Sequence, residues 1–353
     1  MGVKPRVRLQ SRGTEMSIAF LFPGQGAQHP GMLHALPDHP AVARTIAEVS
    51  ETLQQNMLDL DTADALRSTV SVQLALLASG VAAARALEEE GVAPLAVAGN
   101  PAGAFSAAVV AGALELRDAA TLMRERGERM SELYPRGYGM AAIIGLSENQ
   151  VCDLTRQVQP AQAQVYISGV NAPLQIVIAS SDAGVDSVIE SARKRGARKA
   201  ERLDVFAPSH SLLLQPVAEA LKKRILTMRL REPKRVYIAN VTGRALRSAE
   251  AIAQHVAQNI AHPVHWYDAA TVLEEMDCGL FLEMPPGHTL SRLAYAAFAE
   301  VRALALAETS LEGAVQLAQG YNTNKGKITS KSACCGVTRG EEMGIECAVG
   351  GSP

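Results

Sequence analysis

The chain alternates short apolar runs with longer stretches in which apolar positions recur every three or four residues. The apolar runs at 18–22 and 94–99 are bounded by turn residues, which predicts buried strands. The helical spacing predicts helices at about 40–56, 62–68, 71–90, 103–113 and 117–133. Strands that alternate with helices in this order predict a parallel sheet covered by helices.

The pattern changes from about residue 138. The next elements are predicted to be a strand, a helix, two strands, a helix and a strand, at 139–146, 147–158, 163–171, 175–181, 182–196 and 198–205. This β-α-β-β-α-β order is typical of a ferredoxin-like unit. The parallel-sheet pattern resumes afterwards. We therefore expect a small domain at 138–206, inserted into a discontinuous large α/β domain at 16–137 and 207–319.

The two ends of the chain differ from this pattern. Residues 1–15 precede the first predicted strand and are expected to form an extension outside the fold. Residues 320–353 have no apolar periodicity and are rich in Gly, Ser, Thr and Lys, which predicts a disordered tail.

Composition narrows the function classes. The formal net charge is −2, so no general attraction to nucleic acid or to an anionic membrane is expected. We expect no apolar run of the roughly 20 residues that a membrane-spanning helix needs. The five cysteines show neither metal-finger spacing nor a disulfide framework, which favours reduced thiols and a cytoplasmic location.

The stretch GNPAG, Gly99 to Gly103, lies between a predicted strand and a small-residue helix. The pattern G-x-S-x-G is typical of an elbow that presents a nucleophilic serine, and here Pro101 occupies the serine position. Proline has no hydroxyl, and its ring fixes φ near about −65°, whereas an elbow nucleophile has a strained, positive φ. We therefore expect a remodelled turn at this position.

Arg126 lies in RERGERM and shares one helix face with apolar residues, at spacings of three and four. A charge on an apolar face is costly unless it is paired, either in a structural ion pair or with a bound anion. A guanidinium suits a carboxylate because its planar fork donates two parallel hydrogen bonds.

His210 lies in APSHSLLLQP, where we expect a helix to begin. The positive end of a helix disfavours the imidazolium, which would keep the ring neutral, as a general base requires. A structural histidine is the alternative interpretation.

These stretches, together with FPGQGAQ (22–28), NAPLQIVIAS (171–180), ANVTG (239–243) and EMPPGHTLSRL (283–293), resemble the malonyl-CoA:acyl-carrier-protein transacylase family over about residues 17–315. The resemblance implies an α/β-hydrolase-like large domain beside the ferredoxin-like one. Within the family it is closest to the epsilon subunit of malonate decarboxylase, on the stretches PGMLHALPDHP, ALRSTVSVQLALL and YPRGYGMAAIIGL.

The resemblance implies a role for each matching residue. Gln25 would lie beside the oxyanion hole, and the backbone N–H of Ala102 would donate to the oxyanion. Arg126 would bind the malonyl carboxylate, with Asn171 on the substrate side in the small domain.

His210 would be the catalytic base, oriented by the backbone carbonyl of Asn259. Asn100 replaces the histidine that usually precedes the serine. No metal or bound cofactor is implied.

The implied activity moves malonyl from malonyl-CoA to the CoA-like prosthetic thiol of an acyl carrier protein, through a ping-pong acyl-enzyme. Other malonate decarboxylase subunits would be further partners. Because Pro101 cannot form the acyl-enzyme, two alternatives stay open. One is a pseudoenzyme that binds malonyl-CoA or the carrier, and the other is the product of a decayed gene. Ser106, Ser209, Ser211 and Cys278 are weak candidates for a replacement nucleophile.

Overall fold

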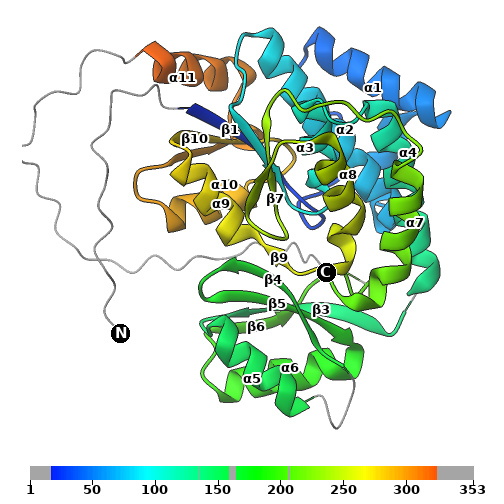
Figure 1. Cartoon of the computed structure of the whole chain (residues 1–353), viewed down its shortest axis with the longest axis vertical. Helices are drawn as coiled ribbons and strands as arrows, with labels where there is room; N and C mark the ends of the chain where they lie inside the picture. Colours follow the sequence, from blue (N-terminus) through cyan, green and yellow to red (C-terminus); the bar gives the residue numbers. More distant parts are fainter. Residues whose placement is uncertain (1–16, 135, 159–163, 206, 324–353) are drawn as a thin grey trace, which may run out of the picture.

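A computed structural model describes residues 17–134, 136–158, 164–205 and 207–323, which form two sheets with their helices (Figure 1). The larger sheet has six strands in the order β11-β10-β1-β2-β7-β8. Its neighbours are parallel, except that β8 runs antiparallel to β7. The strands are β1 (Ser17–Phe22), β2 (Ala96–Gly99), β7 (Val236–Ala239), β8 (Arg244–Leu246), β10 (Cys278–Glu283) and β11 (Arg302–Ala305).

Helices cover this sheet, and their apolar faces form its core with the strands. They are α1 (Pro40–Leu53), α2 (Thr69–Glu89), α3 (Gly103–Ala111), α4 (Leu116–Leu133), α7 (Gln215–Ile225), α8 (Ala249–Gln258), α9 (Trp266–Glu275), α10 (Thr289–Ala297) and α11 (Leu311–Thr323). Short 3-10 turns lie at η1 (Met57–Asp61), η2 (Ala65–Arg67), η3 (Leu212–Leu214), η4 (Asn259–Ala261) and η5 (Leu306–Glu308).

The central helix α2 is, by length and composition alone, apolar enough to cross a membrane, contrary to the expectation from the sequence. However, 89% of its apolar window is buried inside the fold, where α2 packs against α1, α3 and α4. Its apolar character on all sides therefore fits a core helix of the large domain.

The smaller sheet has the order β6-β3-β5-β4-β9. Its elements are β3 (Tyr138–Ile144), α5 (Glu148–Val158), β4 (Tyr166–Ala172), β5 (Gln175–Ser181), α6 (Asp182–Lys194), β6 (Lys199–Arg202) and β9 (Val264–His265). The first four strands alternate with α5 and α6 in the ferredoxin-like order, so the predicted two-part α/β fold is confirmed. The sequence did not predict β9, a segment of the large domain that pairs in parallel with β4.

Two other expectations are wrong in detail. The helix predicted at 62–68 is only the short turn η2, which has no buried residue to anchor a longer helix. Helix α11 continues to Thr323, past the expected boundary at 319, and the Tyr321 hydroxyl donates to the carbonyl of Gly279 at 2.8 Å. The predictions for residues 1–15 and for 324–353 lie outside the described residues.

Candidate active site

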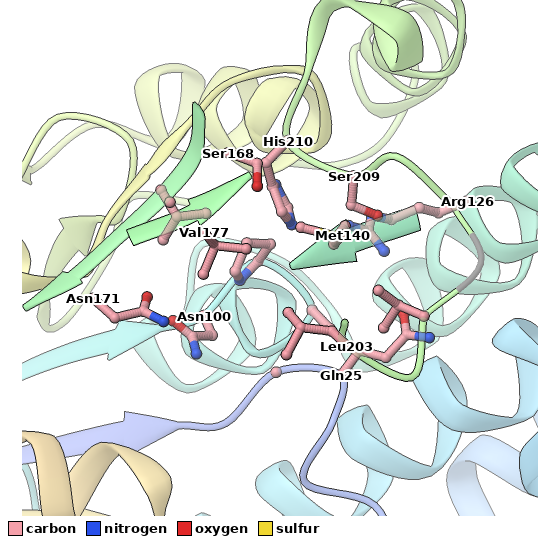
Figure 2. Close-up of a pocket in the computed structure, with 16 residues that line it drawn as sticks. Gln25, Asn100, Arg126, Met140, Ser168, Asn171, Val177, Leu203, Ser209 and His210 are labelled. Carbon is pink, nitrogen blue, oxygen red and sulfur yellow. The ribbon is translucent and has the colours of Figure 1, made fainter. Parts of the chain in front are cut away.

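A pocket lies where the carboxyl ends of β1 and β2 face the smaller sheet (Figure 2). Ends of parallel strands are a common place for ligands in α/β folds, because loops and helix N-termini converge there. The pocket has a volume of about 700 Å³, counting its open mouth. Eight residues named from the sequence line it, namely Gln25, Asn100, Pro101, Ala102, Arg126, Asn171, Ser209 and His210. Asn259 lies directly behind it.

The elbow keeps a tight strand-to-helix junction between β2 and α3. A Cβ at Gly99 would lie 2.4 Å from the backbone of Gly103, and a Cβ at Gly103 would lie 2.3 Å from the carbonyl oxygen of Phe22. Neither position accepts a side chain without moving the backbone. The two glycines are thus required by packing, whatever residue stands between them.

Pro101 lies buried in this turn, and it is not among the residues with positive φ, as its ring requires. Ala102 has φ −69° and ψ −44°, and α3 begins directly after it. Its N–H belongs to the first turn of the helix, where backbone donors have no acceptor within the helix. The junction therefore offers a donor at the pocket floor but no hydroxyl at position 101.

His210 is in the left-handed region, with φ 63°, and its backbone N–H donates to the carbonyl of Ile260 at 2.8 Å. The ring stays partly accessible from the pocket, while the surrounding protein removes most of its water and lowers its pKa to about 4. The positive charge of Arg126 contributes to this lowering of the pKa. The ring is neutral, as predicted, but the expected cause was wrong. Burial is the main cause of the lowered pKa of His210. His210 does not stand at the start of a helix, since η3 begins at Leu212 and α7 at Gln215.

Asn259 links the histidine to the elbow. Its backbone carbonyl accepts from Nδ1 of His210 at 2.9 Å, and its side-chain Nδ2 donates to the carbonyl of Pro101 at 3.2 Å. Since a carbonyl only accepts, Nδ1 carries the proton and Nε2 carries the free lone pair. The resemblance implied only the backbone contact; the side-chain contact to the elbow is a finding of the structure.

Arg126 is 2% exposed, on the buried face of α4. Helix α4 approaches α2 closely because Gly127 has no side chain: a Cβ there would lie 2.8 Å from Cα of Val70. Among the described residues Arg126 forms no ion pair, its Nε has no hydrogen-bond partner, and burial lowers its pKa to about 9. Of the two alternatives that the sequence left open, the structural ion pair is therefore not formed among the described residues. The guanidinium is a buried cation facing a pocket.

The other residues proposed from the sequence take different positions. Gln25 is exposed at the pocket rim, and Asn171 lines the wall formed by β4 (Figure 2). Ser106 is buried in α3 against Gly80, and the Ser211 hydroxyl donates to Pro208, so neither faces the pocket. Cys278 begins β10, at the opposite end of the sheet strands.

Ser168 also lines the pocket and was not predicted from the sequence. It is 1% exposed, and its hydroxyl has no hydrogen-bond partner among the described residues. Strand alternation would place Ser168 and Asn171 on opposite faces of β4. The β4–β5 register shifts between Ile167 and Gly169 and again between Val170 and Ala172, so both reach the pocket. The adjacent Gly169 and Asn-Ala-Pro stretch were the only local signals of this irregularity.

No group of three His, Cys, Asp or Glu side chains that could hold a metal ion occurs among the described residues. The pocket's polar groups are instead a neutral imidazole, a guanidinium, amides and hydroxyls. This set can bind an anionic acyl group and move a proton.

The chain matches the family model of the acyl transferase domain over residues 19–325. It is 34% identical to the malonyl CoA-acyl carrier protein transacylase of Bacillus subtilis strain 168, over 87% of this chain and 99% of the relative. The crystal structure of an acyl-carrier-protein S-malonyltransferase from Burkholderia pseudomallei 1710b has a TM-score of 0.81 at 33% identity, covering 85% of this chain and all of the other.

A second solved structure contains a type II PKS acyl carrier protein in complex with its malonyl transacylase. That transacylase is 33% identical to this chain, with a TM-score of 0.81 over 85% of this chain and 99% of the other. These matches extend over both domains and the pocket between them. The chain therefore belongs to the acyl transferase family.

Proposed function

We propose that the pocket binds the malonyl group of malonyl-CoA, as in a malonyl-CoA:acyl-carrier-protein transacylase, and that Pro101 prevents the acyl-enzyme from forming. The relatives named as malonyl transacylases support the substrate class. The observation that carries the proposal is the buried guanidinium of Arg126 in the pocket wall, which has no ion-pair partner in the described part of the chain.

A buried cation without an anion is unfavourable, because the protein interior replaces water poorly. The free carboxylate of a malonyl thioester would supply the missing charge and accept two parallel hydrogen bonds from the guanidinium. An acetyl or simple fatty acyl group would leave Arg126 unpaired. The pocket is therefore expected to select a dicarboxylic acyl group.

The thioester end of the substrate would face the elbow. In a transacylase of this family, His210 would take the proton of an elbow hydroxyl, and the Ala102 N–H, with Gln25 nearby, would stabilise the oxyanion. Pro101 has no hydroxyl to give. With respect to covalent transfer, the chain is then a pseudoenzyme that keeps the base and the carboxylate site.

The partner would be an acyl carrier protein with a CoA-like prosthetic thiol, in the cytoplasm. We place the chain beside malonate decarboxylase, with its other subunits as further partners. The support is the three sequence stretches in 30–40, 65–77 and 134–146.

Calorimetry with malonyl-CoA and with acetyl-CoA tests the substrate class. We expect malonyl-CoA to bind at least tenfold more tightly, and we expect this preference to vanish in Arg126→Ala. Equal binding of the two thioesters by the unmodified chain would overturn the assignment.

Intact-protein mass measurement after incubation with malonyl-CoA tests the covalent step separately. We expect no mass gain. A stable malonyl adduct would show that the chain forms an acyl-enzyme after all.

A further inference from the structure

The His210 ring is arranged as a base with no partner to deprotonate at position 101. Nδ1 is committed to the Asn259 carbonyl at 2.9 Å, which leaves the lone pair on Nε2 free. The ring lines the pocket and stays neutral over the physiological pH range, since burial disfavours its charged form. A neutral, oriented imidazole at a thioester site is equipped to activate whatever small hydroxylic molecule reaches it.

Ser168 gives the same pocket a second unsatisfied polar group. Its hydroxyl is 1% exposed and makes no hydrogen bond with a described residue. Buried hydroxyls almost always have a partner, so one that faces a pocket indicates a bound ligand or water.

The fold brings Ser168 and His210 to one region. Asn259 and Ile260 hold His210, and a few residues later Val264 of β9 pairs with Gly169, the neighbour of Ser168. Both side chains project into the pocket (Figure 2).

We propose that the chain hydrolyses malonyl-CoA directly, with a water molecule held by Ser168 and activated by His210, and without an acyl-enzyme. This inference rests on the proposed binding of malonyl-CoA. Ser168 acts here as a positioning residue, whose hydroxyl would accept from or donate to the water.

The reaction needs only water. Nε2 of His210 takes a proton as the water oxygen bonds to the thioester carbon, and the carbonyl electron pair moves to the oxygen, which the Ala102 N–H stabilises. The carbon–sulfur bond then breaks, and the CoA thiolate takes the proton back from His210. The products are malonate and CoA, so no oxidant, reductant or second acyl acceptor is consumed.

Arg126 sets which thioester is hydrolysed. Its guanidinium would hold the free carboxylate, which fixes the thioester end relative to His210. Both side chains line the same pocket, and the positive charge of Arg126 contributes to the low pKa of His210. Acetyl-CoA lacks the carboxylate and is expected to be hydrolysed at least tenfold more slowly.

The test measures release of the CoA thiol from malonyl-CoA by the full chain, with calorimetry of binding beside it. We expect steady turnover that falls by about 100-fold or more in His210→Ala. Ser168→Ala is expected to lower kcat with little change in KM, and Ser168→Thr, which keeps the hydroxyl, to restore part of it. His288→Gln, which changes a partly exposed histidine that contacts Glu308 outside the pocket, serves as the matched control and should behave like the unmodified chain.

Each failure has a distinct meaning. Binding of malonyl-CoA without release of CoA would overturn the hydrolysis and leave the proposed binding intact. Absence of binding would overturn both. Turnover that passes through a malonyl adduct on Ser168, detected by peptide mass mapping during the steady state, would also overturn direct attack by water. A fall in Ser168→Ala that Ser168→Thr does not reverse would remove Ser168 from the mechanism.

Discussion

The elbow around Pro101 and the proposed carboxylate site at Arg126 differ in whether the side chains needed for acyl transfer are present. At the elbow, Gly99 and Gly103 still allow close packing of the backbone. A Cβ at either position would lie 2.3–2.4 Å from a neighbouring backbone atom. The residue between them at the nucleophile position is nevertheless Pro101. In the same pocket, Arg126 is buried and charged, and His210 is partly buried and neutral, as binding of a malonyl thioester requires. The glycines therefore preserve the packing of the strand-to-helix turn by themselves. Whether the turn also carries a nucleophile depends on the single side chain at position 101.

We expect the largest effect from restoring a nucleophile at the elbow. Asn100→His combined with Pro101→Ser supplies a hydroxyl beside a base that is already in place. We expect a malonyl ester at position 101, and a rate of malonyl transfer to a carrier thiol higher by on the order of 10⁴-fold or more. Mass mapping of the ester and a transfer assay measure this.

Pro101→Ser alone is the matched control, and it should give a smaller gain. Should the double variant bind malonyl-CoA but form no ester, the backbone of the elbow, and not its side chain alone, would separate the two regions.

The next effect is on the carboxylate site. Arg126→Ala leaves the malonyl carboxylate without a partner in a buried site, so we expect affinity for malonyl-CoA to fall by roughly 10²-fold or more. Arg126→Lys keeps the charge but loses the planar fork, and we expect an intermediate loss. Calorimetry decides, with acetyl-CoA as the reference ligand. An unchanged Kd in Arg126→Ala would mean that Arg126 does not bind the malonyl carboxylate.

A third change tests whether the elbow glycines are structural. Gly103→Ala places a methyl group 2.3 Å from the Phe22 carbonyl oxygen, so the backbone must shift. We expect the free energy of unfolding to fall by roughly 1–3 kcal/mol, or more if the junction cannot relax. Denaturant titration measures it, with Gly320→Ala in α11 as control because a Cβ at that position would meet no atom within 4 Å. A neutral Gly103→Ala would mean that the junction can accept a side chain and that Gly103 is not required by packing.

The smallest expected effect is a pH dependence of binding. Burial lowers the pKa of Arg126 to about 9, and the malonyl carboxylate binds its charged form. The affinity for malonyl-CoA is therefore highest well below pH 9, where Arg126 is fully charged, and it falls as the pH rises through 9. Between pH 9 and 10 we expect affinity for malonyl-CoA to fall by up to about tenfold, and affinity for acetyl-CoA to change much less. Identical profiles for the two thioesters would show that Arg126 keeps its charge or does not contact the substrate.

Much of the site could be predicted from residue patterns. Periodicity placed Arg126 on the apolar face of α4, and the burial of Leu122, Met123, Gly127 and Met130 on that face confirms it. At the start of α5, Ser147 and Gln150 form a capping box, in which each side-chain oxygen accepts from the backbone N–H of the other residue. These features are local, so neighbouring residues in the sequence suffice to specify them.

Other features escaped prediction because distant segments create them. The neutrality of His210 comes from burial by several elements, and its positive φ is held by Ile260, fifty residues away in the chain. Ser168 reaches the pocket only because two irregularities in β4 break the strand alternation.

The sequence by itself determined that Pro101 carries no hydroxyl and cannot take the φ of an elbow nucleophile, because both facts belong to the residue's own covalent structure. The spacing of apolar residues also determined the β-α-β-β-α-β order of the small domain, although not the pairing of β9 with its edge. Only the tertiary structure decided that Arg126 is left without a carboxylate among the described residues and that Asn259 ties His210 to the elbow. The partners and the burial of a side chain depend on which distant segments of the chain are in contact. Those contacts are set by packing across the whole fold.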